Sequence, residues 1–215
     1  MADRLNSKEI KYQQAFWVFM AGSVLGFVLE GLWCVWRKGA WENHAATVWG
    51  PLCLVYGVGA LAIYVMAMYS QGWRARRQFF WCALAGTAVE YFTSLFQELL
   101  FGSRSWDYSK HYIHLNGRVS LRMTLMWGLL GLLFIRLIMP LLQRWLSHMQ
   151  GVFWQRACVM LSCWMVVNLL LTGAALSRWK ERQQDIAPGN CVELSLDKHF
   201  PNARMEAIFN NMVFN

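Results

Sequence analysis

Apolar stretches long enough to cross a lipid bilayer dominate this chain and constrain its fold more than any other feature. They cover residues 14–36, 47–70, 78–101, 119–142 and 152–176. A helix needs about 20 residues to cross the hydrocarbon core, and within lipid only helices and closed barrels satisfy every backbone polar group. The sequence therefore predicts an all-α, polytopic membrane helix bundle of about five transmembrane helices. We expect residues 1–177 to form this domain and residues 178–215 to form a polar C-terminal tail.

The composition agrees with a membrane protein and disfavours other classes. Hydrophobic residues make up 57% of the chain and charged residues only 15%, where soluble domains carry about a quarter. The net charge is +8. Most basic residues fall in short segments between apolar stretches, where anionic lipid headgroups account for them. Membrane lipid is thus an expected partner and nucleic acid is not. The basic residues nearly balance across the two sides, but the short Arg-rich connector at residues 74–77 favours a cytoplasmic N-terminus.

The cysteines and histidines indicate no cofactor. Five of the six cysteines lie in apolar stretches, and no Cys/His grouping has the usual spacing of a metal site. We therefore predict no metal and no cofactor. His111 and His114 follow Asp107 in the longest internal loop, where histidines more often face solvent than act in acid–base chemistry.

Three carboxylates lie inside predicted spans, where charge is expensive. They are Glu30 in the first span and Glu90 and Glu98 in the third. An ionised acid at this depth costs roughly 2.5 kcal/mol or more, so such residues face a bundle interior or a wet cavity. Glu90, Ser94 and Glu98 follow at intervals of four and form one polar stripe on a helix. Polar contacts that merely hold helices together are the alternative.

Further polar groups are expected on the membrane side to which Glu30 and Glu98 point. Span polarity places there Arg37, Asn43, Gly50, Pro51 and the loop at residues 102–118. In this loop, Asp107 followed by Ser109 suits an Asx-type turn, and Asn116-Gly117 is a turn dipeptide. Arg118 re-enters the membrane surface where Glu98 leaves it, so we expect an ion pair or an anion site there. A well-ordered turn without a ligand is the alternative interpretation.

Several of these residues also resemble a known family. The first-helix Gly26-x-x-x-Glu30, the block from Gly50-Pro51 to Tyr56-Gly57-x-Gly59, and Glu90 with Glu98 are similar to its motifs. So are Trp106-Asp107-Tyr108 and Asn116-Gly117-Arg118. The family is that of the bacterial ABC-transporter type IV permeases, or CmpB-like membrane proteins, and the match covers residues 26–131.

The resemblance implies a multi-pass protein of the bacterial cytoplasmic (inner) membrane with a role in transport. It implies an ATPase subunit or another membrane protein as partner. It adds Tyr56 to the candidate site, which already includes Trp106 and Tyr108 of the polar loop at residues 102–118, and gives Gly57 a role in a structural turn. The chain departs from the family pattern at residues 43–45, where Asn-His-Ala stands in place of Asn-Arg-Gly, and at Leu54-Val55.

Three functions remain open at this point. The chain is a transport-associated subunit whose polar site takes a small solute, an ion or a lipid headgroup. Alternatively, it is a small intramembrane enzyme with Glu or Asp acid–base groups acting on a lipid or amphiphile, or an assembly partner without a ligand. No catalytic residue is assigned, and the sequence leaves open whether the chain is an enzyme. The convergence of the acids favours a one-sided site over a symmetric pore.

Overall fold

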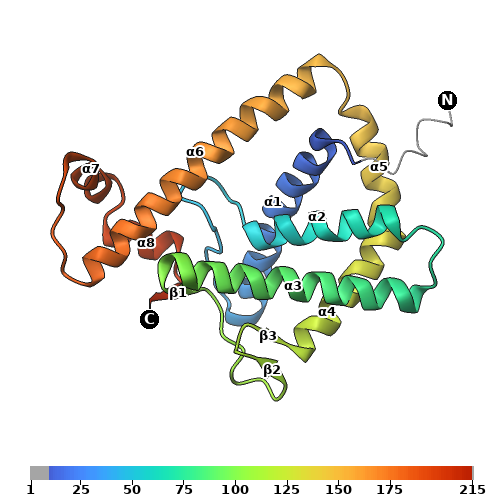
Figure 1. Ribbon diagram of the computed structural model, residues 1–215, viewed down its shortest axis with the longest axis horizontal. Coiled ribbons are helices and arrows are strands. Elements are labelled where there is room, and N and C mark those ends of the chain that lie inside the picture. The colour runs from blue at the N-terminus through green and yellow to red at the C-terminus, as the bar shows by residue number, and fades with distance from the viewer. Residues whose placement is uncertain (1–9, 215) are drawn as a thin grey trace.

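The structure is a computed structural model that describes residues 10–214, and helices make up most of it (Figure 1). The long helices are α1 (Tyr12–Lys38), α2 (Leu54–Tyr69), α3 (Ala75–Phe101) and α6 (Val152–Gln183). Between α3 and α6 run α4 (Leu121–Leu133), the π-helical segment η2 (Phe134–Ile138) and α5 (Met139–His148). Helices α7 (Cys191–His199) and α8 (Asn202–Ile208) follow α6. Four two-residue strands complete the fold, namely β1 (Ser103–Arg104), β2 (His114–Leu115), β3 (Val119–Ser120) and β4 (Val213–Phe214).

The prediction of an all-α membrane bundle is confirmed. Four helical stretches are long and apolar enough to cross a membrane, namely α1, α3, the continuous run Leu121–His148, and α6. Only 22–28% of their most apolar segments is buried within the chain, so their remaining apolar side chains are available to lipid. The fifth helix, α2, is apolar but has 16 residues and therefore extends about 24 Å. The expected five spans thus fit with α2 as a short one.

Helix α2 begins later than the sequence suggests, because the segment before it is bound to α6. The predicted span started at residue 47 and placed Gly50 and Pro51 in its first turns, whereas the helix starts at Leu54. Fully buried Asn168 of α6 accepts a hydrogen bond from the Trp49 amide (3.2 Å) and donates one to its carbonyl (2.7 Å). These bonds satisfy backbone groups that a helix would otherwise pair.

The helix around Pro140 contains a π turn. Proline lacks the N–H that would continue the α-helical ladder, and its ring disturbs the preceding turn. Here the Met139 amide donates to the Phe134 carbonyl, one residue further back than in an α-helix. Arg136 of this π turn is exposed and donates a hydrogen bond to Gln78 Oε1 of α3 (3.3 Å).

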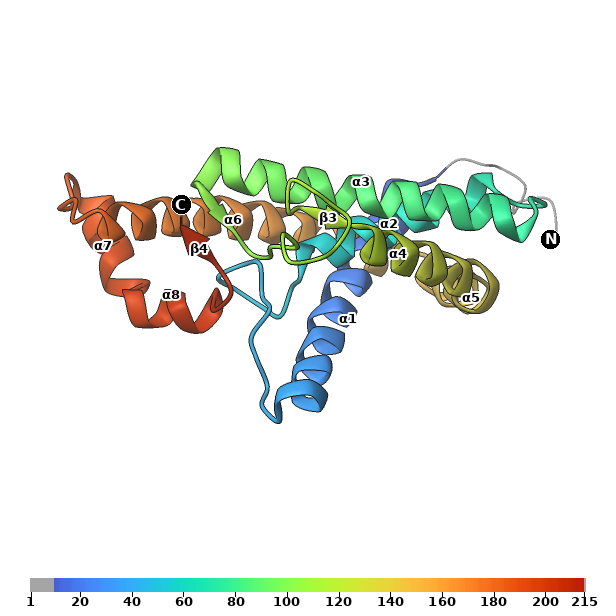
Figure 2. The same cartoon turned by 90° about the horizontal axis from the view of Figure 1, so that it is seen from below.

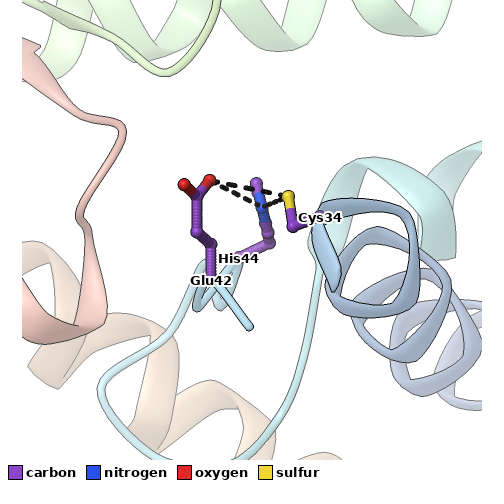
Figure 3. A group of neighbouring side chains, drawn as sticks. All are labelled: Cys34, Glu42 and His44. Carbon is purple, nitrogen blue, oxygen red and sulfur yellow. Dashed lines mark hydrogen bonds and ion pairs between the residues drawn. The ribbon is translucent and has the colours of Figure 1, made fainter. Parts of the chain in front are cut away.

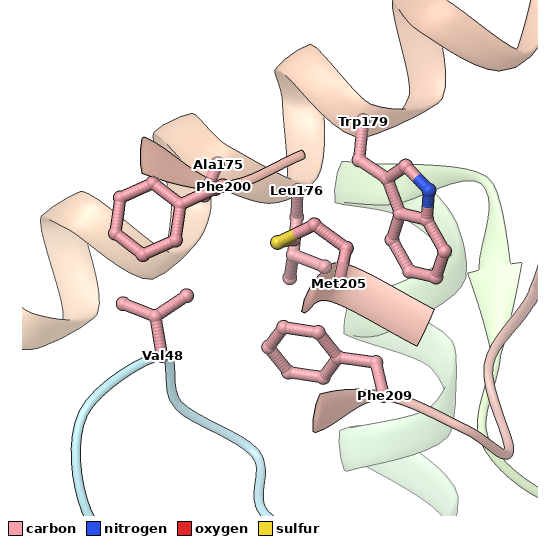
Figure 4. Packing of buried hydrophobic residues seen from close by; sticks show 7 residues of the cluster. All are labelled: Val48, Ala175, Leu176, Trp179, Phe200, Met205 and Phe209. Carbon is pink, nitrogen blue, oxygen red and sulfur yellow. The ribbon is translucent and has the colours of Figure 1, made fainter. Parts of the chain in front are cut away.

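The chain after α6 folds back onto that helix. Val48, Ala175, Leu176, Trp179, Phe200, Met205 and Phe209 form one buried cluster (Figure 4). It joins the loop before α2, the last turns of α6 and the tail around α8. Strand β4 then pairs antiparallel with β1, so that Val213 faces Arg104 directly after α3. The tail therefore contacts segments distant in sequence, and α6 continues past residue 177 to Gln183.

The arrangement leaves the end of α1 apart from the other long helices. Figure 2 shows α2, α3, α4 and α6 in one layer, from which the second half of α1 projects. The chain returns from that end to the layer through residues 39–53, opposite α8. The polar residues singled out from the sequence lie around this region.

Candidate functional site

A cavity of about 490 Å³ lies between α1, α2, α3 and α4 and is bordered by three connecting segments. These segments are residues 43–46, residues 105–108 and residues 208–212 of the tail. The lining includes two carboxylates, Glu30 and Glu90, and no Lys or Arg among the residues that the structure describes. Most of the remaining lining is aliphatic or aromatic, so the cavity combines an apolar wall with two acids.

Glu30 is held by a tyrosine that a glycine brings close. Tyr56 Oη of α2 donates a short hydrogen bond to Glu30 Oε1. Gly26, one turn earlier on α1, allows this contact, because a Cβ on Gly26 would lie 2.3 Å from Tyr56 Cβ. A glycine and an acid four residues apart share one helix face. Gly26 therefore leaves space for the Tyr56 ring, and Glu30 accepts the hydrogen bond from the Tyr56 hydroxyl.

Glu90 is held in the same way on α3. Its Oε1 accepts a hydrogen bond from Tyr108 Oη (2.8 Å) and its Oε2 accepts one from Trp127 Nε1 (3.2 Å). Gly86, again four residues earlier, is in contact with the Trp127 ring, and an added Cβ would lie 2.4 Å from Trp127 Cγ. Burial raises the pKa of Tyr108, so this phenol stays protonated and able to donate.

Glu98 lies outside the cavity lining and forms an ion-pair cluster instead. Arg104 binds it through two hydrogen bonds, of 3.0 and 2.8 Å. Buried Arg118 lies 2.5 Å from Glu98 Oε2, an oxygen that Arg104 also binds, and this is the ion pair expected from the sequence. Arg118 also donates to Ser94 Oγ (3.3 Å). Since two guanidinium groups neutralise Glu98, we interpret it as the group that fixes the loop at residues 102–118 on α3.

The loop at residues 102–118 is held in a fixed conformation by side-chain hydrogen bonds. Asp107 Oδ1 accepts from the Ser109 amide (2.9 Å) and from Ser109 Oγ (2.5 Å), and these bonds hold the Asp107 pKa below its usual range. Gly117 has a φ of 68°, and a Cβ there would lie 2.4 Å from Asp107 Oδ1. Trp106 Nε1 donates to the Arg118 carbonyl (2.9 Å), and Asn116 Nδ2 donates to Tyr91 Oη (3.2 Å).

Of the remaining residues predicted for the site, only Asn43 lines the cavity, and the others lie outside its lining. The Asn43 side chain accepts a hydrogen bond from the Ala45 amide (2.9 Å) and donates one to the Ala207 carbonyl (3.2 Å). Gly57 packs against α1 at Ser23. Gly50 has a φ of 86° and, with Pro51, lies in the irregular segment before α2. Arg37 is exposed, and its side chain makes no hydrogen bond or ion pair within residues 10–214.

Sequence reasoning missed several residues that complete the site. Trp127 was not considered, although a tryptophan in the middle of a span and away from the interface is itself a signal. Asn168 carried a similar signal as an amide within an apolar stretch. Residues 208–212 line the cavity, which no local pattern indicated. Cys34 of α1 lies close to Glu42 and His44, which belong to the segment after this helix (Figure 3).

Four helices that are long and apolar enough to cross a bilayer, most of whose apolar surface is not buried within the chain, are typical of a multi-pass membrane protein. A family model described as "Putative ABC-transporter type IV" matches residues 17–173, which is most of the chain, and the chain belongs to this family. The match confirms the family suggested by the sequence motifs. No curated protein and no solved structure matches the chain.

Proposed function

We propose that this protein is the permease-type membrane component of a transport system of the bacterial cytoplasmic membrane, and that its cavity binds a small organic cation. The observation that carries the proposal is the lining, in which two carboxylates occur with no Lys or Arg. Carboxylates in a largely apolar cavity attract positive charge, and the surrounding aromatic rings favour a cation through their π faces. The apolar wall supports a ligand with an apolar body over a bare metal ion.

The family description implies an ATPase partner, and we propose such a subunit or another membrane protein as a partner. The connections at residues 70–74 and 149–151 are only a few residues long, and neither carries a helix that could couple to an ATPase. Ligand binding is therefore the activity to test first, before ATP-driven translocation.

Benzyltrimethylammonium is a suitable probe, because it joins a fixed positive charge to an aromatic body. We expect the purified protein to bind it in equilibrium dialysis and not to bind benzylsulfonate, the matched anion. Glu30→Gln and Glu90→Gln should each weaken binding about 10-fold or more, since each removes a charge in a weakly screened site. Both variants keep the shape and can still accept a hydrogen bond.

Glu206→Gln is the matched control, because Glu206 is an exposed acid of α8 outside the cavity lining. It should leave the affinity unchanged. Binding of benzylsulfonate as tight as that of the cation, or full binding by the double variant Glu30→Gln/Glu90→Gln, would contradict the proposal. Thermal unfolding of each variant checks that a loss of binding does not reflect a loss of fold.

An intramembrane enzyme is the second candidate. It is favoured by the fact that Glu30 and Glu90 line the same cavity, each beside a tyrosine hydroxyl, as an acid–base pair would be. The two candidates differ in a measurable way. A transport component reconstituted in vesicles releases its ligand unchanged, whereas an enzyme converts an amphiphilic substrate, which mass spectrometry of the recovered compound detects.

A further inference from the structure

Three side chains with metal-binding atoms meet at the end of α1, apart from the two carboxylates described above. Cys34 lies in the last turns of this helix, which ends at Gly39 with a left-handed φ of 74°. The chain then reverses and brings Glu42 and His44 back beside Cys34. Figure 3 shows the three side chains pointing toward one another. Cys34 is buried, and the other two are partly buried.

The distances between the three groups suit a tetrahedral ion. Cys34 Sγ lies 3.2 Å from His44 Nε2 and 3.5 Å from Glu42 Oε2, and the latter two atoms are 3.9 Å apart. Zinc bond lengths to sulfur, nitrogen and oxygen give ligand-to-ligand separations of about 3.4–3.6 Å in a tetrahedron. Shifts of about half an ångström would therefore bring all three atoms into coordination distance, without moving the helix.

We propose that Cys34, Glu42 and His44 form a binding site for a divalent transition-metal ion of the zinc type. Hard ions such as Mg²⁺ and Ca²⁺ prefer oxygen ligands, so a site with a thiolate does not favour them. A sulfur ligand together with an imidazole suits zinc or cobalt. Cys34 loses its proton on binding, so the thiolate and the Glu42 carboxylate together balance the charge of the ion. Three protein ligands leave a fourth position for water or a small ligand, which is the open type of zinc site.

Neighbouring residues support the two ligands outside the helix. Ligating histidines almost always donate their second ring N–H to a partner. Asn211 of the tail lies 3.1 Å from His44 Nδ1, and a rotation of its amide presents the oxygen as acceptor. Lys38 Nζ donates to both oxygens of Glu42, at 2.7 Å from Oε1 and 2.8 Å from Oε2, so metal binding requires it to release Oε2 to the ion and retain Oε1.

The site would link the end of α1 to the cavity wall. His44 lines the cavity, and Asn211 belongs to the tail segment that borders it. A bound ion would therefore fasten α1, residues 42–44 and the tail to one another. This role does not depend on the ligand proposed for the cavity.

Titration of the metal-free, detergent-purified chain with Co²⁺ tests the proposal. We expect one equivalent to bind, with the near-ultraviolet charge-transfer absorption of a cobalt–thiolate bond, and Zn²⁺ to abolish this absorption. Cys34→Ser should remove the band, whereas Cys163→Ser, which changes an exposed cysteine of α6, should retain it. Asn211→Ala should weaken Co²⁺ binding about 10–100-fold. A wild-type protein without the band, or a band that persists in Cys34→Ser, overturns the proposal.

A second measurement avoids any variant that fails to fold. Zn²⁺ added to the unmodified chain should slow the reaction of Cys34 with a small thiol reagent, as followed by mass spectrometry of the modified peptides. The reaction of Cys163, an exposed cysteine of α6 outside the site, should not change. Equal rates for Cys34 with and without Zn²⁺ would also overturn the proposal.

Discussion

At the scale of single residues, the two cavity acids share one arrangement. Glu30 and Glu90 each follow a glycine by four positions, and each glycine is in contact with an aromatic residue from another helix. The polar atom of that aromatic residue then binds the acid. This explains how an expensive carboxylate is tolerated in an apolar helix, since its oxygens find fixed donors.

Gly26→Ala tests this arrangement. The added methyl group would overlap the Tyr56 side chain, so we expect a loss of about 1–3 kcal/mol in stability and a weakened hydrogen bond to Glu30. Thermal unfolding in detergent measures the first effect. Gly173→Ala on α6 is the control, because its Cβ meets only Phe101 Cζ at 4.0 Å, so we expect it to be neutral or stabilising by up to about 1 kcal/mol. Equal melting temperatures of the two variants would contradict the account.

The sequence was informative about the acids and about one partner, Arg118 of Glu98, and uninformative about their other partners. Glu30, Glu90 and Glu98 stand out as charges in apolar stretches, and no pattern in one chain says that Glu98 meets two arginines while the others face a cavity. That division depends on helix rotation and on the path of the loop at residues 102–118. Tyr108 entered as part of the polar loop at residues 102–118, Tyr56 entered only through the family resemblance, and Trp127 did not enter at all.

At the scale of elements, hydropathy predicted the helices well because spanning length and apolar content are local properties. It failed at the start of α2, where Asn168 of α6 binds the backbone of Trp49 and Thr172 accepts from the Val48 amide, so that this segment is irregular. It also gave no indication of the contacts of α7 and α8, which depend on long-range packing. Asp197 of α7 lies between Arg178 and Arg182 of α6 and is the main polar link of α7 to α6.

The attachment of α7 should depend on pH. Hydrogen bonds from Arg178 and then from Arg182 hold the Asp197 pKa below its usual value. Such a carboxylate stabilises the fold above the unfolded pKa of about 3.9, and this contribution is lost as the pH falls through the lower folded value. Hydrogen exchange of α7, corrected for the intrinsic rate, should therefore show protection at neutral pH that declines below pH of about 4.

Asp197→Asn should lose part of this protection already at neutral pH and show little further change on acidification. Asp185→Asn is the control, since Asp185 is exposed after the end of α6 and Asn tolerates its φ of 57°. Protection of α7 that is the same in both variants at all pH values would show that Asp197 does not hold this helix.

At the scale of the whole molecule, the tail is part of the cavity wall. Residues 208–212 contribute to the lining, and Phe209 and Met205 anchor them in the buried cluster of Figure 4. Removal of residues 201–215 should therefore expose Cys53, a buried residue of the lining, and raise its labelling rate with a maleimide about 10-fold or more. Peptide mapping by mass spectrometry follows each cysteine separately.

The exposed Cys163 of α6 is an internal control in the same sample and should react at an unchanged rate. A truncated chain whose Cys53 reacts as slowly as before would show that the tail does not cover the lining. The circular dichroism of both chains must indicate intact helices for the comparison to hold.

The pairing of β1 with β4 also makes the tail a marker of sidedness. It fixes the last described residues beside the loop that follows α3, on the side of the bundle where the cavity lies. The charge distribution hardly distinguishes a cytoplasmic from a periplasmic N-terminus. Protease digestion of the tail in sealed vesicles of known orientation does distinguish them. Digestion in right-side-out vesicles alone would mean that the cavity faces the periplasm, as a cytoplasmic N-terminus and five spans require. Digestion in inverted vesicles alone would mean that it is loaded from the cell interior.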